Sequence, residues 1–289
     1  LGREVMVARD SHVSDATAVK AREKAWLNLR PLALAAALLG ATLCGCATPP
    51  EDPGARADYE ALNDPLEPFN RGIFSFNQVL DGAVLKPAAQ AYVWAFPVEF
   101  REVVHRVLSN AHEPVVFANS LLQGNFDHMG TTLLRLLLNT TFGVGGMFDV
   151  ASELGLEPVD EDFGQTLAVW GMGEGFYLVL PVFGPSSLRD GIGRGVDIFF
   201  DPMTYVTINS DKDFLGPSFM ATTALDLRSR HLEALDEIER SSVDFYAAMR
   251  SLYRQHRTNL IFNGETPEGD PFIDDPFDYD DVFSRLEAE

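Results

Sequence analysis

The chain has 289 residues, with 43 acidic against 22 basic side chains and a formal net charge of −21. This length allows one large domain or two small ones. The strong negative charge argues against binding to nucleic acid or to an anionic lipid surface by bulk attraction. Phenylalanine predominates among the aromatic residues, with 21 against 7 tyrosines and 3 tryptophans, which suits apolar surfaces that need no polar handle.

The first 45 residues are typical of a secretory signal. Basic residues lie upstream of an apolar run at residues 32–43, and that run is too short for a spanning helix. Residues 1–19 are acidic and mixed, unlike the start of a signal peptide. We therefore expect the true translation start to lie downstream of residue 1.

The sequence LCGC at residues 43–46 resembles the lipobox of bacterial lipoproteins. Leu43 occupies the position three residues before the lipidated cysteine, the small residue Gly45 directly precedes it, and Cys46 receives the lipid. The alternative is an ordinary signal peptide with incidental cysteines. We expect Cys46 to be lipidated after removal of residues 1–45, because several acyl chains make a stable anchor. Ala47 is not the Asp that marks retention in the inner membrane, which favours the outer membrane.

Composition divides the rest of the chain into three segments. Residues 46–63 are rich in Pro, Ala and acids, and indicate a lipidated flexible tether. Residues 64–264 show apolar positions at helical spacing almost throughout, which predicts one all-α domain. Residues 265–289 hold ten acids and one arginine without any periodic pattern, and predict a disordered acidic tail.

Several boundaries within the helical domain can be predicted. Pro114 is expected near the start of a helix separate from residues 98–108. Ser186 and Ser242 are expected to cap the helices that follow them. The apolar run 176–183 contains Pro181, which argues against a central strand and favours an irregular or short-helical segment.

The helix expected at residues 126–142, capped by Asn125, carries one narrow polar stripe on an otherwise apolar surface. Two interpretations are open. The helix is buried with a satisfied polar seam, or it contacts lipid and turns the seam toward an internal passage. The stripe consists of His128, Thr131, Thr132, Arg135 and Asn139.

Glycines at positions 143, 145 and 146 follow this helix directly and permit either a tight turn or a hinge.

No catalytic signature is present. The sequence lacks a GxSxG nucleophile elbow, an HExxH metal motif, a GxGxxG loop and a Walker A loop. The histidines of residues 105–256 stand singly, without ligand spacing. We therefore expect no enzyme, no bound metal and no cofactor.

Several motifs resemble the MlaA (VacJ) family, in order over about residues 60–265. The most specific are DPLEPFNR at 64–71, NTTFGVGG at 139–146, DFGQT at 162–166 and YLVLP at 177–181. Shorter matches are GPS at 184–186, LRD at 188–190 and IFNGE at 261–265. Phe176 departs from the family, which usually has Pro there, and Ala168 stands where Gly is common.

The resemblance implies an outer-membrane lipoprotein that keeps phospholipid out of the outer leaflet. Family members are ring-like helical domains embedded in the inner leaflet of the outer membrane, with a central amphipathic passage. The implied partners are phospholipid, a trimeric outer-membrane porin and a periplasmic lipid-carrier protein of the Mla system. On this reading Arg135, Asn139 and Thr132 line the passage, and Gly143, Gly145 and Gly146 form its hinge or gate.

Two other classes of function remain as alternatives, a membrane-anchored lipid hydrolase and a purely structural outer-membrane lipoprotein. Headgroup selectivity, transport direction and the stoichiometry with a porin are not readable from the sequence.

Overall fold

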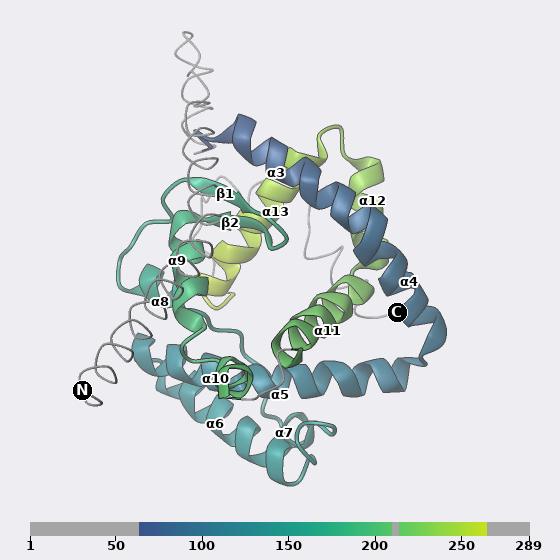
Figure 1. Cartoon of the computed structure of the whole chain (residues 1–289). Helices are drawn as coiled ribbons and strands as arrows, with labels where there is room; N and C mark the ends of the chain where they lie inside the picture. Colours follow the sequence, from purple (N-terminus) through teal and green to yellow (C-terminus); the bar gives the residue numbers. More distant parts are fainter. Residues whose placement is uncertain (1–63, 210–213, 265–289) are drawn as a thin grey trace, which may run out of the picture. The chain divides into compact units, whose positions relative to one another are not determined.

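The structure, a computed structural model, describes residues 64–209 and 214–264 (Figure 1). The predicted signal peptide, Cys46, the tether and the acidic tail lie outside these residues. The chain divides into two units, of which the larger holds Pro49–Pro65 and Asn70–Glu289. The elements below belong to this larger unit, except that α3 begins just before Asn70.

Helices dominate the described residues, as predicted. α3 continues without a break through one π-helical turn, η1, into α4, and the other helices follow in chain order. Their bounds are α3 (Glu67–Leu80), η1 (Asp81–Leu85), α4 (Lys86–Ala95), α5 (Val98–Gln123), α6 (Phe126–Thr141), α7 (Val150–Glu153), α8 (Phe163–Val169), α9 (Leu188–Asp197), α10 (Pro202–Asn209), α11 (Leu215–Arg230), α12 (Leu232–Ser241) and α13 (Phe245–Ile261).

Contacts between these helices form a closed circuit. α4 contacts α11, which contacts α5, and α5 contacts α8. α8 in turn contacts α13, α13 contacts α12, and α12 returns to α4. The helices of this circuit can be followed in Figure 1, with α6 packed along α5 beside it.

The segment around Pro181 differs from the prediction. Residues Tyr177–Leu180 form strand β1, which pairs antiparallel with β2 (Gly184–Ser187), so the irregular or short-helical assignment is wrong. Pro181 falls in the turn between the strands, where its missing N–H breaks no ladder hydrogen bond. The all-α prediction is therefore corrected to a mostly helical domain with one hairpin among the described residues.

Two asparagines of α3 complete the free edge of β1. The Asn70 amide donates to the Tyr177 carbonyl at 3.0 Å and accepts from the Val179 N–H at 3.0 Å. Asn77, two turns later on the same face, makes the equivalent pair with the Leu180 carbonyl at 2.9 Å and the Val182 N–H at 2.8 Å. These side chains replace a third strand, because unpaired backbone groups at a buried edge are costly.

The buried face of α3 is therefore not the one that apolar periodicity predicts. Asn70 and Phe74 are buried, and Phe74 packs with Tyr177, Val179 and Tyr246 in the core cluster. The sequence predicts an apolar face from the helical spacing of Leu66, Phe69, Ile73, Phe76 and Leu80, yet Phe76 is 53% exposed. The hydrogen bonds of Asn70 and Asn77 to the hairpin, together with the burial of Phe74, orient this helix.

We expect Asn70→Ala to lower the free energy of unfolding by about 3 kcal/mol, since it leaves a buried carbonyl and a buried N–H without partners. The matched variant Asn77→Ala acts on the half-buried end of the same edge. We expect it to lower the free energy of unfolding by about 1 kcal/mol. Denaturant unfolding in a neutral detergent, followed by circular dichroism, measures both. Equal losses in the two variants would contradict this account of the hairpin.

Three predicted helix boundaries are wrong. Pro114 lies inside α5, which stays continuous because it contacts α6, α8, α10 and α11. Ser187, not Ser186, caps α9, because the Ser187 hydroxyl is the one that accepts from the Asp190 N–H, at 3.1 Å. The carboxylate of Asp244, rather than the hydroxyl of Ser242, caps α13. The predicted cap of α6 is confirmed, since the Asn125 side chain accepts from the His128 N–H at 3.1 Å.

Candidate functional site

The polar stripe of α6 faces protein, and Arg135 is its centre. This side chain is only 3% exposed. Its guanidinium donates to Glu113 Oε1 at 3.0 Å, to Ser152 Oγ at 2.9 Å and to Asp149 Oδ2 at 3.2 Å. A further bond reaches the Leu156 carbonyl. Arg135 therefore joins α5, α6 and α7 through buried, charge-assisted hydrogen bonds.

Three further residues of the stripe also face protein, while Thr131 is half-buried. Asn139 donates to Asp149 Oδ1 at 2.9 Å and accepts from the Ala151 N–H at 3.0 Å. His128 Nδ1 lies 2.8 Å from Glu161 Oε1. Thr132 is fully buried, and its hydroxyl has no hydrogen-bond partner among the described atoms. The stripe matches the interpretation of a buried polar seam, while its lining of a passage stays a prediction.

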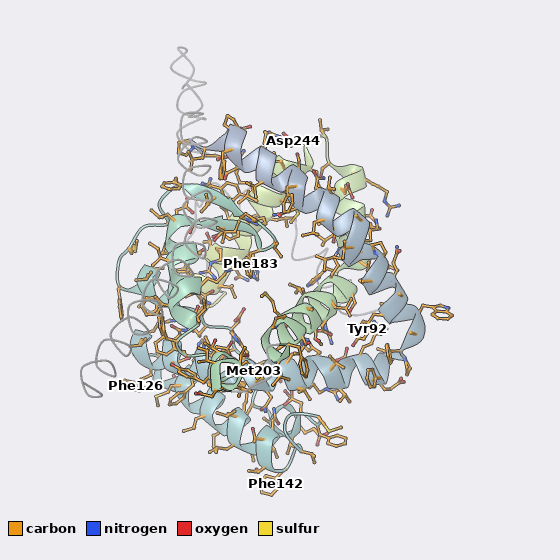
Figure 2. The ribbon with its side chains drawn as sticks, in the orientation of Figure 1. Tyr92, Phe126, Phe142, Phe183, Met203 and Asp244 are labelled. Atoms are coloured by element: carbon orange, nitrogen blue, oxygen red, sulfur yellow. The ribbon has the colours of Figure 1, made fainter. Side chains whose placement is uncertain are left out.

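The opposite side of α6 is apolar and exposed. Phe126 and Phe142, at the two ends of the helix in Figure 2, are 68% and 73% exposed. Leu133, Leu134 and Leu137 between them are exposed as well. Helix α6 thus buries its polar side and presents its apolar side outward, the reverse of a helix on a water-soluble domain.

The same reversal extends through the domain. Buried charges are common, while large apolar side chains lie exposed on many elements, of which Trp94 at 88% is an extreme case. The buried ionisable residues include Asp64, Glu113, Arg135, Glu161, Arg189, Asp190, Asp226, Arg228, Arg250 and Arg254. Within residues 64–209 and 214–264, no helix has the length and hydropathy needed to cross a membrane.

The glycine segment after α6 forms a hydrogen-bonded turn. The N–H groups of Gly143, Gly145 and Gly146 donate to carbonyls in the last turns of α6, and Phe148 N–H donates back to the Gly143 carbonyl at 3.0 Å. A Cβ atom on Gly143 would lie 2.2 Å from the Phe148 carbonyl oxygen. The described conformation is a closely packed turn, and the role of these glycines as a gate stays a prediction.

Asp149 ties this turn to the seam. Burial alone would raise its pKa, but hydrogen bonds from Ser152, Asn139 and Arg135 outweigh that effect and lower the pKa of Asp149 to about 2. The neighbouring Glu113 differs, because burial outweighs its bond to Arg135 and raises its pKa. The folded state therefore favours the ionised form of Asp149 and the protonated form of Glu113, so a fall in pH has opposite effects on the stability that each contributes.

Because the pKa of Asp149 is lower in the folded state, its ionised form stabilises the fold above about pH 4. That contribution is lost as the pH falls from about 4 toward 2. We expect Asp149→Asn to remove on the order of 2 kcal/mol at pH 6 and to differ little from the unmodified protein near pH 2. Unfolding free energies measured at pH 6, 4 and 2.5 check this. A constant difference across that range would contradict it.

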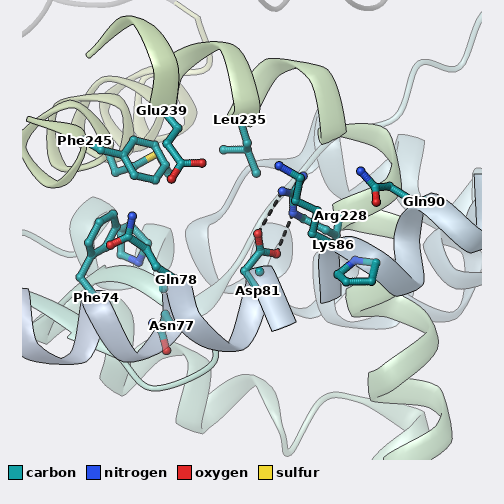
Figure 3. A pocket seen from close by; sticks show the side chains of 15 residues that line it. Phe74, Asn77, Gln78, Asp81, Lys86, Gln90, Arg228, Leu235, Glu239 and Phe245 are labelled. Atoms are coloured by element: carbon teal, nitrogen blue, oxygen red, sulfur yellow. Dashed lines mark hydrogen bonds and ion pairs between the residues drawn. The ribbon is translucent and has the colours of Figure 1, made fainter. Parts of the chain in front are cut away.

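A cavity of about 530 Å³ lies between α3, η1, α4, the start of β2, the end of α11, α12 and α13 (Figure 3). One end holds a cluster of four charged groups. Arg228 donates to both oxygens of Asp81 at 2.7 and 3.0 Å, and the Lys86 ammonium lies 2.7 Å from Asp236. The lining residues are Phe74, Asn77, Gln78, Asp81, Gly82, Lys86, Pro87, Gln90, Gly184, Pro185, Arg228, Leu235, Glu239, Phe245 and Met249.

The charged cluster is electrostatically satisfied. Burial alone would lower the pKa of Arg228, but Asp81 and then Asp236 outweigh it, and that pKa is raised. The pKa of Asp236 is held below its ordinary value, since its bonds to Lys86 and Arg228 outweigh the effect of burial. Sequence reasoning missed this cavity because Arg228 and Asp81 lie 147 positions apart. The one signal in the sequence that points to this cavity is Lys86, because lysine is rare in a domain whose basic residues are mostly arginine.

A helical domain with charged side chains inside and large apolar side chains outside belongs to the class of proteins that contact a membrane or another protein through an apolar surface. The sequence profile of the MlaA lipoprotein family matches residues 62–260, and the chain belongs to this family.

Individual relatives agree with this assignment. The chain is 33% identical to the intermembrane phospholipid transport system lipoprotein MlaA of Escherichia coli, over 86% of this chain and 98% of that protein. It is 39% identical to an uncharacterised protein of Rickettsia typhi, over 68% of this chain and 76% of that protein. A structure solved in a study of the structural basis for maintenance of bacterial outer membrane lipid asymmetry matches with a TM-score of 0.61 and 31% identity. That match covers 68% of this chain and 98% of the other.

Family membership confirms the resemblance seen in the motifs and the prediction of a mostly helical fold. It also confirms the prediction that the chain is not an enzyme, because the family consists of transport lipoproteins.

Proposed function

We propose that this chain is an outer-membrane lipoprotein that provides a passage for phospholipid from the outer leaflet toward a periplasmic carrier, and so maintains lipid asymmetry. Its family and its similarity to MlaA of Escherichia coli support this function. The observation that carries the proposal is the reversed polarity of the domain, with exposed apolar side chains around a charged interior.

Reversed polarity suits a protein that lies within one leaflet. Exposed side chains such as Trp94, Phe126 and Phe142 are favourable in hydrocarbon and costly in water. The described helices do not reach the length and hydropathy of a membrane span. We propose that the domain is a ring embedded in the inner leaflet of the outer membrane, and the closed circuit of helix contacts supports that arrangement.

A ring of this kind solves a physical problem. A phospholipid that leaves the outer leaflet must carry its charged headgroup past hydrocarbon, which is costly without polar partners. A polar interior enclosed by apolar helices supplies those partners without ATP. Net direction then comes from the downstream carrier, because a passive passage cannot set it.

The predicted passage residues receive a more limited role. Arg135 and Asn139 are engaged by Asp149, and Arg135 by Glu113 as well. We propose that they act by positioning α7 and the glycine turn against α6. Contact of lipid with Arg135, Asn139 or Thr132, and gating by Gly143, Gly145 and Gly146, remain predictions.

We also propose two protein partners on the basis of family membership, a trimeric porin of the outer membrane and the soluble lipid carrier of the Mla system. Exposed apolar side chains on α6 and its following turn offer a surface that could pack against a porin wall as well as against lipid.

Lipidation of Cys46 is the next part of the proposal. We expect Cys46→Ala to block processing by lipoprotein signal peptidase, because the thiol at the lipidation position is removed. The variant should be absent from outer-membrane fractions. Cys44→Ala is the matched control and should be processed and acylated normally. Intact-mass measurement of both proteins tests this, and normal acylation of the Cys46 variant would contradict it.

Purification of the mature protein in a neutral detergent tests the function against its alternatives. We expect intact phospholipid to co-purify and to remain intact during incubation. Release of fatty acid or headgroup, measured by mass spectrometry, would support the membrane-anchored hydrolase. A protein that carries no lipid would support the structural lipoprotein.

A further inference from the structure

The cavity between α3, η1, α4, α12 and α13 has one charge without a partner. Glu239 of α12 lines it and makes no hydrogen bond or ion pair with any described residue. The other charged lining groups, Lys86, Asp81 and Arg228, are paired within the cluster they form with Asp236. An incoming ligand therefore meets two neutralised cations and one free carboxylate.

This balance decides which charge the cavity favours. With two cationic and three anionic groups, the cluster and Glu239 together carry a net charge of −1. A free anion would have to displace Asp81 or Asp236 from its partner, and the short bonds of 2.7 Å oppose that. A positively charged group needs no displacement, because Glu239 is available.

Aromatic side chains stand at the same end of the cavity as Glu239. In Figure 3 its carboxylate lies on the side of Phe245 and Phe74, and Leu235 separates it from Arg228. The rings of Phe74 and Phe245 are 5.4 Å apart and meet edge to face. A carboxylate near aromatic rings is an arrangement that favours ammonium groups, since ring quadrupoles attract cations.

A hydrogen-bond donor stands at the same end of the cavity. The side-chain amide of Gln78 lies beside Phe74 in Figure 3 and has no partner among the described residues, while Gln90, which is also unpaired there, lies at the opposite end beyond Arg228. Amide N–H groups can donate to phosphate oxygens without adding charge. The cavity thus combines an ammonium site with a neutral phosphate donor, and about 530 Å³ is a typical volume for a small-molecule site.

We propose that this cavity binds the headgroup of a zwitterionic phospholipid of the ethanolamine type, with its ammonium at Glu239 and its phosphate toward the Gln78 amide. Anionic phospholipids such as phosphatidylglycerol bind less well, because they bring negative charge and no ammonium. This inference rests on the proposed function and adds headgroup preference to it.

The test uses the mature protein in neutral detergent with equimolar short-chain phosphatidylethanolamine and phosphatidylglycerol. Native mass spectrometry counts the bound molecules of each. We expect the ethanolamine lipid to be favoured about tenfold, and Glu239→Gln to reduce that preference to about twofold or less. Glu237→Gln is the matched control, because Glu237 is an exposed carboxylate on the same helix that does not line the cavity.

The outcomes separate the two proposals. Equal binding of both lipids by the unmodified protein, or an unchanged preference in Glu239→Gln, would overturn the headgroup assignment alone. Failure of the unmodified protein to bind either lipid would overturn the proposed function together with it. Circular dichroism of the two variants establishes that each is folded, and the isosteric change from Glu to Gln at an exposed position is expected to preserve the fold.

Discussion

Replacement of Arg135 by Met is expected to lower the free energy of unfolding by about 3–5 kcal/mol. The substitution keeps an apolar stem of similar length but leaves Glu113 and Asp149 without the guanidinium that binds both. Glu113 suffers most, since its carboxylate is almost fully buried. Denaturant unfolding of the mature protein in detergent measures the loss.

Two variants make this result specific. Adding Glu113→Gln to Arg135→Met removes the uncompensated buried charge, so we expect recovery of about 1–2 kcal/mol. Arg194→Met changes an exposed arginine whose only described contact is with the Phe183 ring, and should stay within about 0.5 kcal/mol of the unmodified protein. If Arg135→Met were folded and stable but inactive in lipid transport, Arg135 would act on lipid directly.

Replacement of Gly143 by Ala should have the second large effect. The new methyl carbon would meet the Phe148 carbonyl oxygen at 2.2 Å and the Asn139 carbonyl oxygen at 2.5 Å. Both are backbone atoms, so the turn itself must shift. We expect the free energy of unfolding to fall by about 3 kcal/mol. Thermal unfolding followed by circular dichroism measures this change.

Gly145→Ala is the matched control two residues later. No atom lies within 4 Å of its added Cβ, and only the φ of +73° opposes the substitution. We expect this substitution to lower the free energy of unfolding by about 1 kcal/mol. A gate that must flex would show the opposite order in function, with Gly145→Ala impairing transport in a fully folded protein. A loss of transport that follows the amount of folded protein in both variants would contradict gating.

The sequence predicts the helical character of the domain well, because its signals are local. Asn125 caps α6 as expected, and α4 ends at Ala95, two positions before a proline that cannot continue a helix. The family motifs lie in the predicted order and carry the assignment of the fold. Turn and capping residues act over three or four positions, which a single sequence displays directly.

The direction in which each helix faces could not be predicted the same way. Apolar periodicity assigns one apolar side of α3 to a core, yet the structure buries Asn70 and leaves Phe76 exposed. For α6 the pattern left burial and lipid contact both open, and the structure buries Arg135 and exposes the apolar side. The periodicity rule assumes water outside the protein, and we propose that lipid takes its place here. The hairpin was missed for a related reason, since β1 is stabilised by Asn70 and Asn77 from more than 100 residues away.

The candidate cavity was beyond reach of local patterns altogether. Its ion pairs join Asp81 to Arg228 and Lys86 to Asp236, across separations of 147 and 150 residues. In a chain with 43 acidic residues, a partner for any one cation cannot be chosen from the sequence. The free carboxylate of Glu239 becomes visible only once the other charges of the cavity have been paired.

The central claim is that the chain removes phospholipid from the outer leaflet, and the most direct measurement is the amount of surface-exposed phospholipid in living cells. The host is a Gram-negative strain that lacks its own MlaA protein and expresses this chain, with lipidation and outer-membrane location verified. We predict that surface-exposed phospholipid falls to the level of the parent strain, and that Cys46→Ala fails to lower it. Surface phospholipid that stays high despite folded, lipidated protein in the outer membrane would contradict the account.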